Sequence, residues 1–293
     1  MRPLLSYIPK DELLRQIQCA LAEDIGDGDV TTVGALTAAQ RKAIVSADLV
    51  AKTDGVLAGS EIFSLVFRTV SEDVKLTFNI GDGGHFANGD KLAHLAGPAA
   101  ALLQAERTAL NFIGLLSGIS SLTAKYVQAV SHTKCKILDT RKTTPGWRLL
   151  KKYAVNCGGA VNHRMGLFDM ALIKENHISA AGSITLAVEN IRDYLNDINK
   201  AGTPIIVEVQ TRAELEEALQ AKVDRILLDN QSPPDLRKLV NEARALSPQT
   251  QLEASGNITL SNVAEYAETG VDYISVGALT HSAKVADFSL LMT

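Results

Sequence analysis

KCKILDTRKTTPGWRLLKKYAVNCGGAVNHRMGLFDMALIKENHI, residues 134–178, contains two short apolar runs, and each ends in charged residues. The run at 137–138 leads into Asp139, Thr140, Arg141 and Lys142, and the run at 170–173 leads into Lys174. Parallel α/β sheets place their ligand-binding side chains at the C-terminal ends of such strands. Because these ends are rich in cations, the stretch predicts a site that holds anions.

Beyond this stretch, apolar strands alternate with helices. Strands are predicted at 135–139, 170–174, 204–209, 225–229, 251–255 and 272–276, and helices at 183–200, 211–221, 233–246 and 261–268. Thr211 and Glu214 have the spacing of a capping box. Continuous apolar strands that alternate with helices indicate a parallel sheet covered by helices. The candidates are a (β/α) barrel, complete or incomplete with a seventh strand near 155–159, and an open doubly wound sheet.

The first hundred residues follow a different pattern. A helix is predicted at 10–24 and a turn-rich segment at 26–32, and β-prone runs separated by glycines occupy 42–97. This pattern predicts a small antiparallel or mixed sheet. The GDGG sequence at 81–84 lacks the lysine and the strand-to-helix context of a phosphate loop, so we interpret it as a turn.

The longest predicted helix spans 99–130, with a possible break at Ser117–Gly118. Its apolar residues recur with helical spacing, but Glu106 falls inside the apolar arc and Arg107 on its margin. Two interpretations remain open. Either the helix is half exposed and pairs these charges with neighbours, or it delivers a charge to a ligand or across an interface.

Composition excludes several classes of protein. The chain has 293 residues, 46% hydrophobic residues and a net charge of −4, which argues against a nucleic-acid-binding protein. No apolar run approaches the roughly 18–20 residues of a membrane span, and no signal peptide is evident, so a cytoplasmic protein is expected. Its three cysteines lack CxxC spacing, which predicts neither a disulfide framework nor a zinc site.

Polar residues at the predicted strand ends are expected to meet on one rim of a barrel. They are Asp139–Lys142, Lys174, Glu208, Asp229, Ser255–Asn257 and Gly277–Ala278. Arg141, Arg164, Lys142, Lys174 and His163 suit a ligand with several anionic groups. Glu208 and Asp229 suit Mg²⁺ shared with substrate phosphates, or alternatively form salt bridges with the lysines. The glycine-bearing ends suit a phosphate.

Several stretches together resemble the quinolinate phosphoribosyltransferase family, also called carboxylating nicotinate-nucleotide pyrophosphorylases. They are EDIGDGDVTT (23–32), ERTALNF (106–112), the stretch 136–178, VEV (207–209), ILLDN (226–230), EASGNI (253–258) and ISVGALTHS (274–282). The most specific pieces are DTRKTTPG (139–146) and NHR (162–164) with their spacing. The resemblance extends over nearly the whole chain, in order.

The resemblance implies a pentosyltransferase of NAD biosynthesis. Its reaction converts quinolinate and phosphoribosyl pyrophosphate into nicotinate mononucleotide, pyrophosphate and CO₂. The implied fold is an N-terminal α/β sandwich domain at 1–115, rejoined by the tail at 280–293, and an incomplete α/β barrel domain at 116–279. The only implied cofactor is Mg²⁺.

The resemblance also implies roles for individual residues. Arg141, His163, Arg164 and Lys174 would grip the quinolinate carboxylates, and Lys142 and Lys174 would meet the phosphoribosyl donor. Glu208 and Asp229 would lie near its ribose and Mg²⁺, while Ser255, Gly256, Gly277 and Ala278 would hold the 5′-phosphate. Asn257 is also predicted to bind substrate. Arg107 would reach the same pocket from a neighbouring subunit, which requires a homodimer, with a hexamer as the alternative. His177 is assigned either to the pyrophosphate or to a structural role.

Three other functions remain open from the sequence. One is a phosphoribosyltransferase of the same family with another acceptor. The second is a barrel lyase that uses Lys174 as a Schiff base. The third is a non-catalytic protein that binds anions and has kept the fold.

Overall fold

The computed structural model describes residues 3–293, which form two compact units. The first combines the chain up to Ala124 with Thr144–Gly159 and Ser282–Thr293, and the second combines Lys125–Thr143 with Ala160–His281. Whether residues 1–115 with the tail, and 116–279, fold as separate domains stays a prediction. Among the described helices, none has the length and apolarity needed to cross a membrane.

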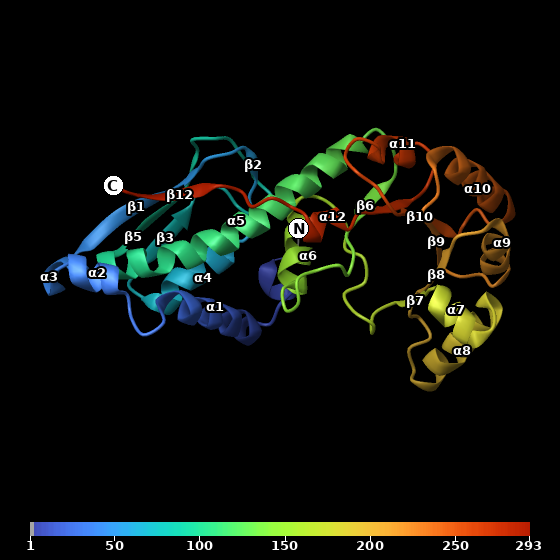
Figure 1. Ribbon diagram of the computed structural model, residues 1–293, viewed down its shortest axis with the longest axis horizontal. Helices are drawn as coiled ribbons and strands as arrows, with labels where there is room; N and C mark the ends of the chain where they lie inside the picture. The colour runs from blue at the N-terminus through green and yellow to red at the C-terminus, as the bar shows by residue number, and fades with distance from the viewer. Residues whose placement is uncertain (1–2) are drawn as a thin grey trace. The chain divides into compact units, whose positions relative to one another are not determined.

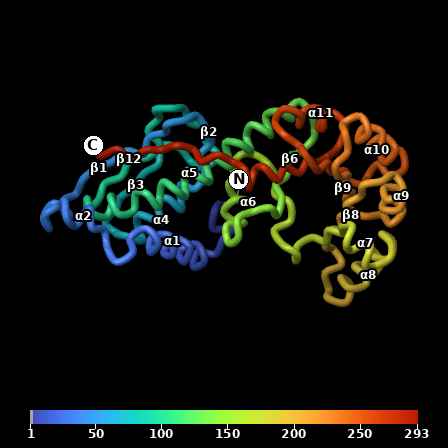
Figure 2. Tube along the Cα trace, viewed as in Figure 1, coloured from blue at the N-terminus to red at the C-terminus, as the bar shows by residue number. Residues whose placement is uncertain are grey.

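The first unit is built on an antiparallel sheet. Its strand order is β12 (Phe288–Met292), β1 (Ile44–Ala51), β5 (Lys91–Pro98), β3 (Lys75–Phe78). Figure 2 shows the C-terminal strand β12, in red, running beside β1, in blue. A short pair, β2 (Gly55–Val56) and β4 (His85–Phe86), lies outside this sheet. Of the antiparallel or mixed sheet predicted for 42–97, the antiparallel alternative is confirmed.

Besides the long helix α5 (Ala99–Ala129), the described helices of the first unit are η1 (Leu4–Ser6), α1 (Lys10–Ile25), α2 (Val30–Ala35), α3 (Ala38–Lys42), α4 (Ser60–Val70) and α6 (Arg148–Cys157). The α1 helix buries Leu13, Ile17 and Leu21 at helical spacing and packs on α4 (Figure 1). Our prediction overlooked α2 within the turn-rich segment and α4 within the β-prone segment. The signal for α4 was present, because Ile62, Phe63, Val66 and Phe67 also have helical spacing and are all buried.

The long helix α5 (Ala99–Ala129) is continuous, so the predicted break at Ser117–Gly118 is wrong. Its glycines allow a close contact with the C-terminal tail. A Cβ atom on Gly118 would lie 2.0 Å from the Lys284 carbonyl oxygen, and one on Gly114 would lie 2.9 Å from the Ala286 oxygen. The Ala286 N–H donates to the Gly114 carbonyl at 2.9 Å. Glycine is therefore required here for packing and does not interrupt the helix.

The second unit contains a parallel sheet. Its strand order is β6 (Lys136–Leu138), β11 (Tyr273–Ser275), β10 (Gln251–Ser255), β9 (Arg225–Asp229), β8 (Ile205–Val209), β7 (Ala171–Ile173). Consecutive strands are neighbours and the last strand pairs with the first, as in a barrel; a doubly wound sheet would instead reverse its order in the middle. The recorded pairs leave an opening between β6 and β7 among the described strands. The incomplete barrel is confirmed.

Helices connect the barrel strands, as Figure 1 shows. They are α7 (Glu175–Ala181), α8 (Ile184–Asp197), α9 (Arg212–Gln220), α10 (Pro233–Leu246) and α11 (Val263–Ala267), and a further short helix, α12 (Ala278–His281), follows the last barrel strand, β11. The capping box at Thr211 and Glu214 forms as predicted. The seventh strand considered near 155–159 is wrong, because α6 continues to Cys157. Instead, Val161 forms a single parallel bridge with Leu138 of β6.

Candidate active site

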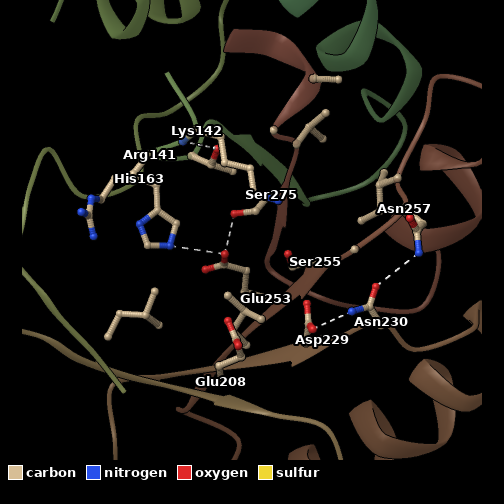
Figure 3. A pocket seen from close by; sticks show the side chains of 18 of the residues that line it. Arg141, Lys142, His163, Glu208, Asp229, Asn230, Glu253, Ser255, Asn257 and Ser275 are labelled. Carbon is tan, nitrogen blue, oxygen red and sulfur yellow. Dashed lines mark hydrogen bonds and ion pairs between the residues drawn. The ribbon is translucent and has the colours of Figure 1, made fainter. Parts of the chain in front are cut away.

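A cavity of about 690 Å³ opens at the C-terminal ends of the barrel strands. Figure 3 shows its side chains converging from several strands and their loops. All the predicted cations of the second unit line it, as do both predicted carboxylates and the glycine-bearing loops: Arg141, Lys142, His163, Arg164, Lys174, Glu208, Asp229, Ser255, Gly256, Asn257, Gly277 and Ala278. Residues far apart in sequence thus share one cavity.

Strand periodicity explains why polar side chains face this cavity. Successive residues of a strand point to opposite faces, so Arg225, Leu227 and Asp229 of β9 share one face. The register places Ser255 of β10 beside Asp229 and Glu253 beside Leu227. The strand face inside the barrel is therefore polar at the C-terminal rim, where Asp229 and Ser255 lie, and at Glu253.

Asp139 ties the two halves of the 134–178 stretch together. Its carboxylate is fully buried and accepts hydrogen bonds from the His163 backbone N–H and from the Asn162 amide, both at 2.8 Å. Hydrogen bonds to an ionised carboxylate are among the stronger ones in proteins. The NHR segment (162–164) is thereby held against the end of β6, next to Arg141.

Two arginines face this part of the cavity with few protein partners. The Nε atom of Arg141 is buried and has no hydrogen-bond partner among the described residues. Arg164 is buried, with one recorded bond from Nη1 to the Met170 carbonyl oxygen at 3.2 Å. Burial, and then the positive charge of Arg141, lower the pKa of Arg164, while Asp169 opposes the shift. A carboxylate between the arginines would relieve this repulsion.

His163 is oriented by both of its ring nitrogens. Nδ1 accepts the Arg164 backbone N–H at 2.7 Å, so it carries no proton in this arrangement. Nε2 faces Oε1 of Glu253 at 3.4 Å, as the dashed line in Figure 3 shows. The geometry therefore favours the tautomer protonated on Nε2.

Glu253 is the most important residue of the cavity that the sequence prediction did not assign to the site. It is fully buried on β10 and accepts a hydrogen bond from Ser275 Oγ at 2.5 Å. It also forms an ion pair with Arg225 at 3.1 Å. Burial alone would raise the pKa of Glu253, but His163, Ser275 and Arg225 outweigh it and hold the pKa below its ordinary value. A lone glutamate inside a buried strand was the signal that could have identified it.

Lys174, Glu208 and Asp229 form the acidic side of the cavity. Lys174 follows β7 and pairs through Nζ with Glu208 of β8. Asp229 ends β9 and accepts a hydrogen bond from the Asn230 amide at 2.6 Å. Burial, and then the Glu208 charge, raise the pKa of Asp229, although Lys174, Asn230 and Lys142 act in the opposite direction. The salt bridge considered for Glu208 therefore forms, and Asp229 lies in the negative field of a second carboxylate.

The glycine-bearing loops shape the remaining wall. Gly256 has φ of +100°, and a Cβ atom there would lie 2.1 Å from Asn230 Oδ1. The Asn257 amide reaches the same oxygen at 3.3 Å. At Gly277, a Cβ atom would lie 3.4 Å from Lys142 Cδ and 3.2 Å from the His281 imidazole. His281 also lines the cavity, and our prediction gave it no role.

Two predicted residues are absent from the described residues that line the cavity. Arg107 is exposed on α5 in the first unit and is absent from the described residues that line the cavity. His177 accepts the Lys174 backbone N–H at 3.0 Å at the start of α7, which supports the structural alternative.

Comparisons with known proteins agree over both parts of the chain. Residues 29–117 match the model of the quinolinate phosphoribosyl transferase N-terminal domain, and residues 119–291 match the model of the C-terminal domain. A probable carboxylating nicotinate-nucleotide pyrophosphorylase of Bacillus subtilis is 42% identical over 92% of this chain and 90% of its own length. The Mycobacterium leprae enzyme of that name is 40% identical over 98% of this chain and 99% of its own.

Comparison with solved structures agrees with the sequence comparisons. The solved structure of the nicotinate-nucleotide pyrophosphorylase from Francisella tularensis matches with a TM-score of 0.91 and 39% identity, and the match covers 98% of each chain. Sequence identity at this level over nearly full length applies to both compact units. The chain therefore belongs to the quinolinate phosphoribosyltransferase family.

Proposed function

We propose that this protein transfers a phosphoribosyl group from phosphoribosyl pyrophosphate to quinolinate, with loss of CO₂, and so forms nicotinate mononucleotide for NAD biosynthesis. The observation that carries the proposal is the pair Arg141 and Arg164, two cations that share one wall of the cavity and have few protein acceptors. The activities named for the relatives, at about 40% identity, support it.

The acceptor half of the site is the arginine side. Arg141 and Arg164, with Lys174 and His163, would hold the two carboxylates of quinolinate. Forked guanidinium donors match planar carboxylates and fix their orientation. A ligand with two carboxylates suits this density of cations better than a monocarboxylate would.

The donor half is the opposite wall. Lys142 and Lys174 would meet the pyrophosphate and the ribose. The loop at Ser255, Gly256 and Asn257, together with Gly277 and Ala278, would hold the 5′-phosphate through close backbone approach, which the side-chain-free positions permit. Glu208 and Asp229 would face the ribosyl carbon and stabilise positive charge that develops there.

Mg²⁺ fits this wall as a shared ion. Glu208 and Asp229 offer hard oxygen ligands from neighbouring strands, but the described part of the chain contains no group of three or more His, Cys, Asp or Glu side chains that could hold a metal alone. The donor's phosphate oxygens and water would supply the other ligands. When bound, Mg²⁺ would offset negative charge on the leaving pyrophosphate.

The chemistry follows from position and charge. The ring nitrogen of quinolinate attacks C1 of the ribose, the N–C1 bond forms, and the C1–O bond to pyrophosphate breaks. The resulting pyridinium draws electrons, so the bond to the adjacent carboxylate can break, releasing CO₂, and the ring carbon takes up a proton. The arginines keep the nitrogen aimed at C1, and holding both reactants supplies much of the rate enhancement.

Arg107 is proposed to complete the acceptor site from another subunit, as the family resemblance implies. Its exposed position on α5 is compatible with contact to a second copy. The proposal requires at least a homodimer, and a cytoplasmic location stays a prediction. Mixing Arg107→Ala subunits with Arg141→Ala subunits tests it, because shared sites would restore activity in mixed dimers.

One assay tests the function. The protein is incubated with quinolinate, phosphoribosyl pyrophosphate and Mg²⁺, and nicotinate mononucleotide, pyrophosphate and CO₂ are measured, with a chelator as control. We expect equimolar products that disappear with the chelator. Binding of quinolinate without products would favour a non-catalytic protein. Turnover of another acceptor alone would favour a relative with different specificity, and borohydride trapping of Lys174 with a carbonyl compound would favour a lyase.

A further inference from the structure

A buried chain of polar contacts runs through the barrel. It begins at Arg225, at the N-terminal end of β9, and continues through Glu253 on β10 to His163 and Ser275 at the cavity. Figure 3 shows that both His163 and Ser275 contact the Glu253 carboxylate from the cavity side. Arg225 is absent from the cavity lining among the described residues, so its only recorded route to the site is through Glu253.

We propose that Arg225 is a positioning residue for the transferase reaction: from the opposite end of the barrel, it holds Glu253 in the orientation that fixes His163 and Ser275 in the substrate cavity. This inference rests on the proposed function and deepens it. It assigns a role to a residue that no substrate would touch.

The contacts of Arg225 are specific for a guanidinium. Nε and Nη2 donate to Gln251 Oε1 at 3.2 and 3.1 Å, while Nη1 pairs with Glu253 Oε2 at 3.1 Å. The guanidinium carbon lies 4.0 Å from the centre of the Tyr273 ring, and the side chain is only 12% exposed. A lysine could provide the charge but neither the fork nor the stacking.

The charge is needed because Glu253 is fully buried. Among the described residues, the titratable groups with a recorded contact or register position facing it are His163 from the NHR segment, Arg225 from β9 and, by register, Tyr273 from β11, and Ser275 adds a neutral donor. A buried carboxylate that loses a fixed positive partner tends to take up a proton. A protonated Glu253 would accept less well from His163 and Ser275, so both groups would lose their orientation.

The principal experiment compares Arg225→Met with Arg244→Met. Arg244 is a matched control in the same unit, because it pairs with Asp272 at 2.7 Å and binds backbone carbonyls but is absent from the described cavity lining. For Arg225→Met we expect the KM for quinolinate to rise by about tenfold to a hundredfold, with a much smaller change for phosphoribosyl pyrophosphate. Arg244→Met should change neither KM, even where it lowers thermal stability.

The pH dependence separates positioning from general destabilisation. Removing the Arg225 charge raises the pKa of Glu253, so Arg225→Met should lose activity at a higher pH on the acidic side than the wild type does. In a Glu253→Gln background, the additional Arg225→Met change should produce no further shift in that acidic limb. If the two substitutions shifted the acidic side of the pH–activity profile additively, the proposal would be overturned.

Chemical rescue uses a second cavity. Arg225 lines a space of about 610 Å³ at the N-terminal ends of the strands, together with Asp224 and Gln251. In Arg225→Ala, methylguanidine at millimolar concentration should enter this space and lower the KM for quinolinate, whereas urea, which is neutral, should not. Equal effects of the two compounds would contradict a need for the charge.

Nuclear magnetic resonance of ¹⁵N-labelled histidine gives a readout that does not depend on turnover. The His163 signals, assigned by a His163→Asn difference, should show the tautomer protonated on Nε2 in the wild type and a changed tautomer balance in Arg225→Met. Arg225→Lys should show a partial effect. If the His163 signals are unchanged, the positioning role is wrong whatever the activity; if the wild type lacks turnover but the signals change, only the proposed function fails.

Discussion

Asp82 in the first unit and Arg141 in the second are both charged residues in loops, but their surroundings differ in one respect. Asp82 accepts hydrogen bonds from the Gly59 N–H at 2.8 Å, the Ser60 N–H at 3.0 Å and the Tyr153 hydroxyl at 2.5 Å. Arg141 has a buried Nε without a hydrogen-bond partner among the described residues. The first charge is satisfied within the protein, and the second is not.

The difference distinguishes a structural charge from one available to a ligand. The GDGG loop (81–84) looked like a phosphate loop in its glycine content, and it does lie beside the N-terminus of α4, where an anion is favoured. Asp82 itself occupies that position, so the loop interpreted as a turn has no free anion site. Among the described residues, no carboxylate has a recorded hydrogen bond or ion pair with either Arg141 or Arg164, although the Asp169 charge acts on Arg164. This arrangement leaves a place for a substrate carboxylate.

The largest effect is expected from Arg141→Met. Losing charged hydrogen bonds of about 1.5–3 kcal/mol each should reduce kcat/KM for quinolinate by at least about a hundredfold. The free energy of unfolding should stay the same or rise, because the substitution removes an unpartnered buried nitrogen and a charge that repels Arg164. Steady-state kinetics and urea unfolding measure the two quantities. A variant with wild-type turnover would refute the assignment of Arg141 to the acceptor site.

Asp82→Ala should produce the opposite result. It removes the cap of α4 and the partner of Tyr153, at a cost of about 2–4 kcal/mol in the free energy of unfolding. Activity of the fraction that remains folded at low temperature should be nearly unchanged. The control is Asp73→Ala, at an exposed position of the same unit, which should change stability by no more than about 0.5 kcal/mol. Activity loss in Asp82→Ala without a change in stability would contradict the structural role.

Ligand binding should stabilise the protein only through the unsatisfied cations. Quinolinate at roughly one hundred times its dissociation constant adds about 2.7 kcal/mol to the stability of the wild type. The increase in Tm should vanish in Arg141→Met and persist in Asp82→Ala, although it starts from a lower Tm there. Nicotinate, with one carboxylate, should give a smaller increase. Equal shifts for the two ligands would argue against a dicarboxylate site.

A smaller effect is expected for Gly256→Ala. The backbone at φ +100° and the 2.1 Å approach to Asn230 Oδ1 make a side chain strained, at about 1–3 kcal/mol. Because this loop belongs to the proposed donor half, the KM for phosphoribosyl pyrophosphate should rise more than the KM for quinolinate. Gly202→Ala, in the same unit and with open space around its Cβ position, is the control and should change neither.

Much of the barrel was predictable because its signals are local. The strands at 225–229 and 251–255 and the helix at 233–246 were predicted with the observed bounds, since each combines an apolar pattern with clear end signals. The end of α6 was considered as a strand at 155–159, because a segment of five residues is too short to reveal its periodicity. The break expected in α5 failed for another reason: Gly118 is explained by the tail that packs on it, and that tail lies more than 160 residues away in sequence.

The site residues could be predicted from the sequence where they lie at or near the C-terminal end of a predicted strand. Arg141, Lys174 and Asp229 were found because each follows or ends an apolar run, and Glu208 because it lies one residue before the end of its strand; all of them line one cavity. Glu253 was missed because it lies inside its strand, and Arg225 because it lies at the other end of the barrel. His281 was missed because α12 is too short to give a periodic signal.

The sequence by itself determined the alternation of strands and helices, the residues at the strand ends and, through long specific motifs, the family. These properties depend on local periodicity and on residue type, which are present in the chain before it folds. Only the tertiary structure decided which charges are satisfied and which are not. Asp82 meets Tyr153, Glu253 meets Arg225 and His163, and Arg141 keeps an unpartnered nitrogen, because burial and hydrogen-bond geometry arise from packing between residues that are distant in the chain.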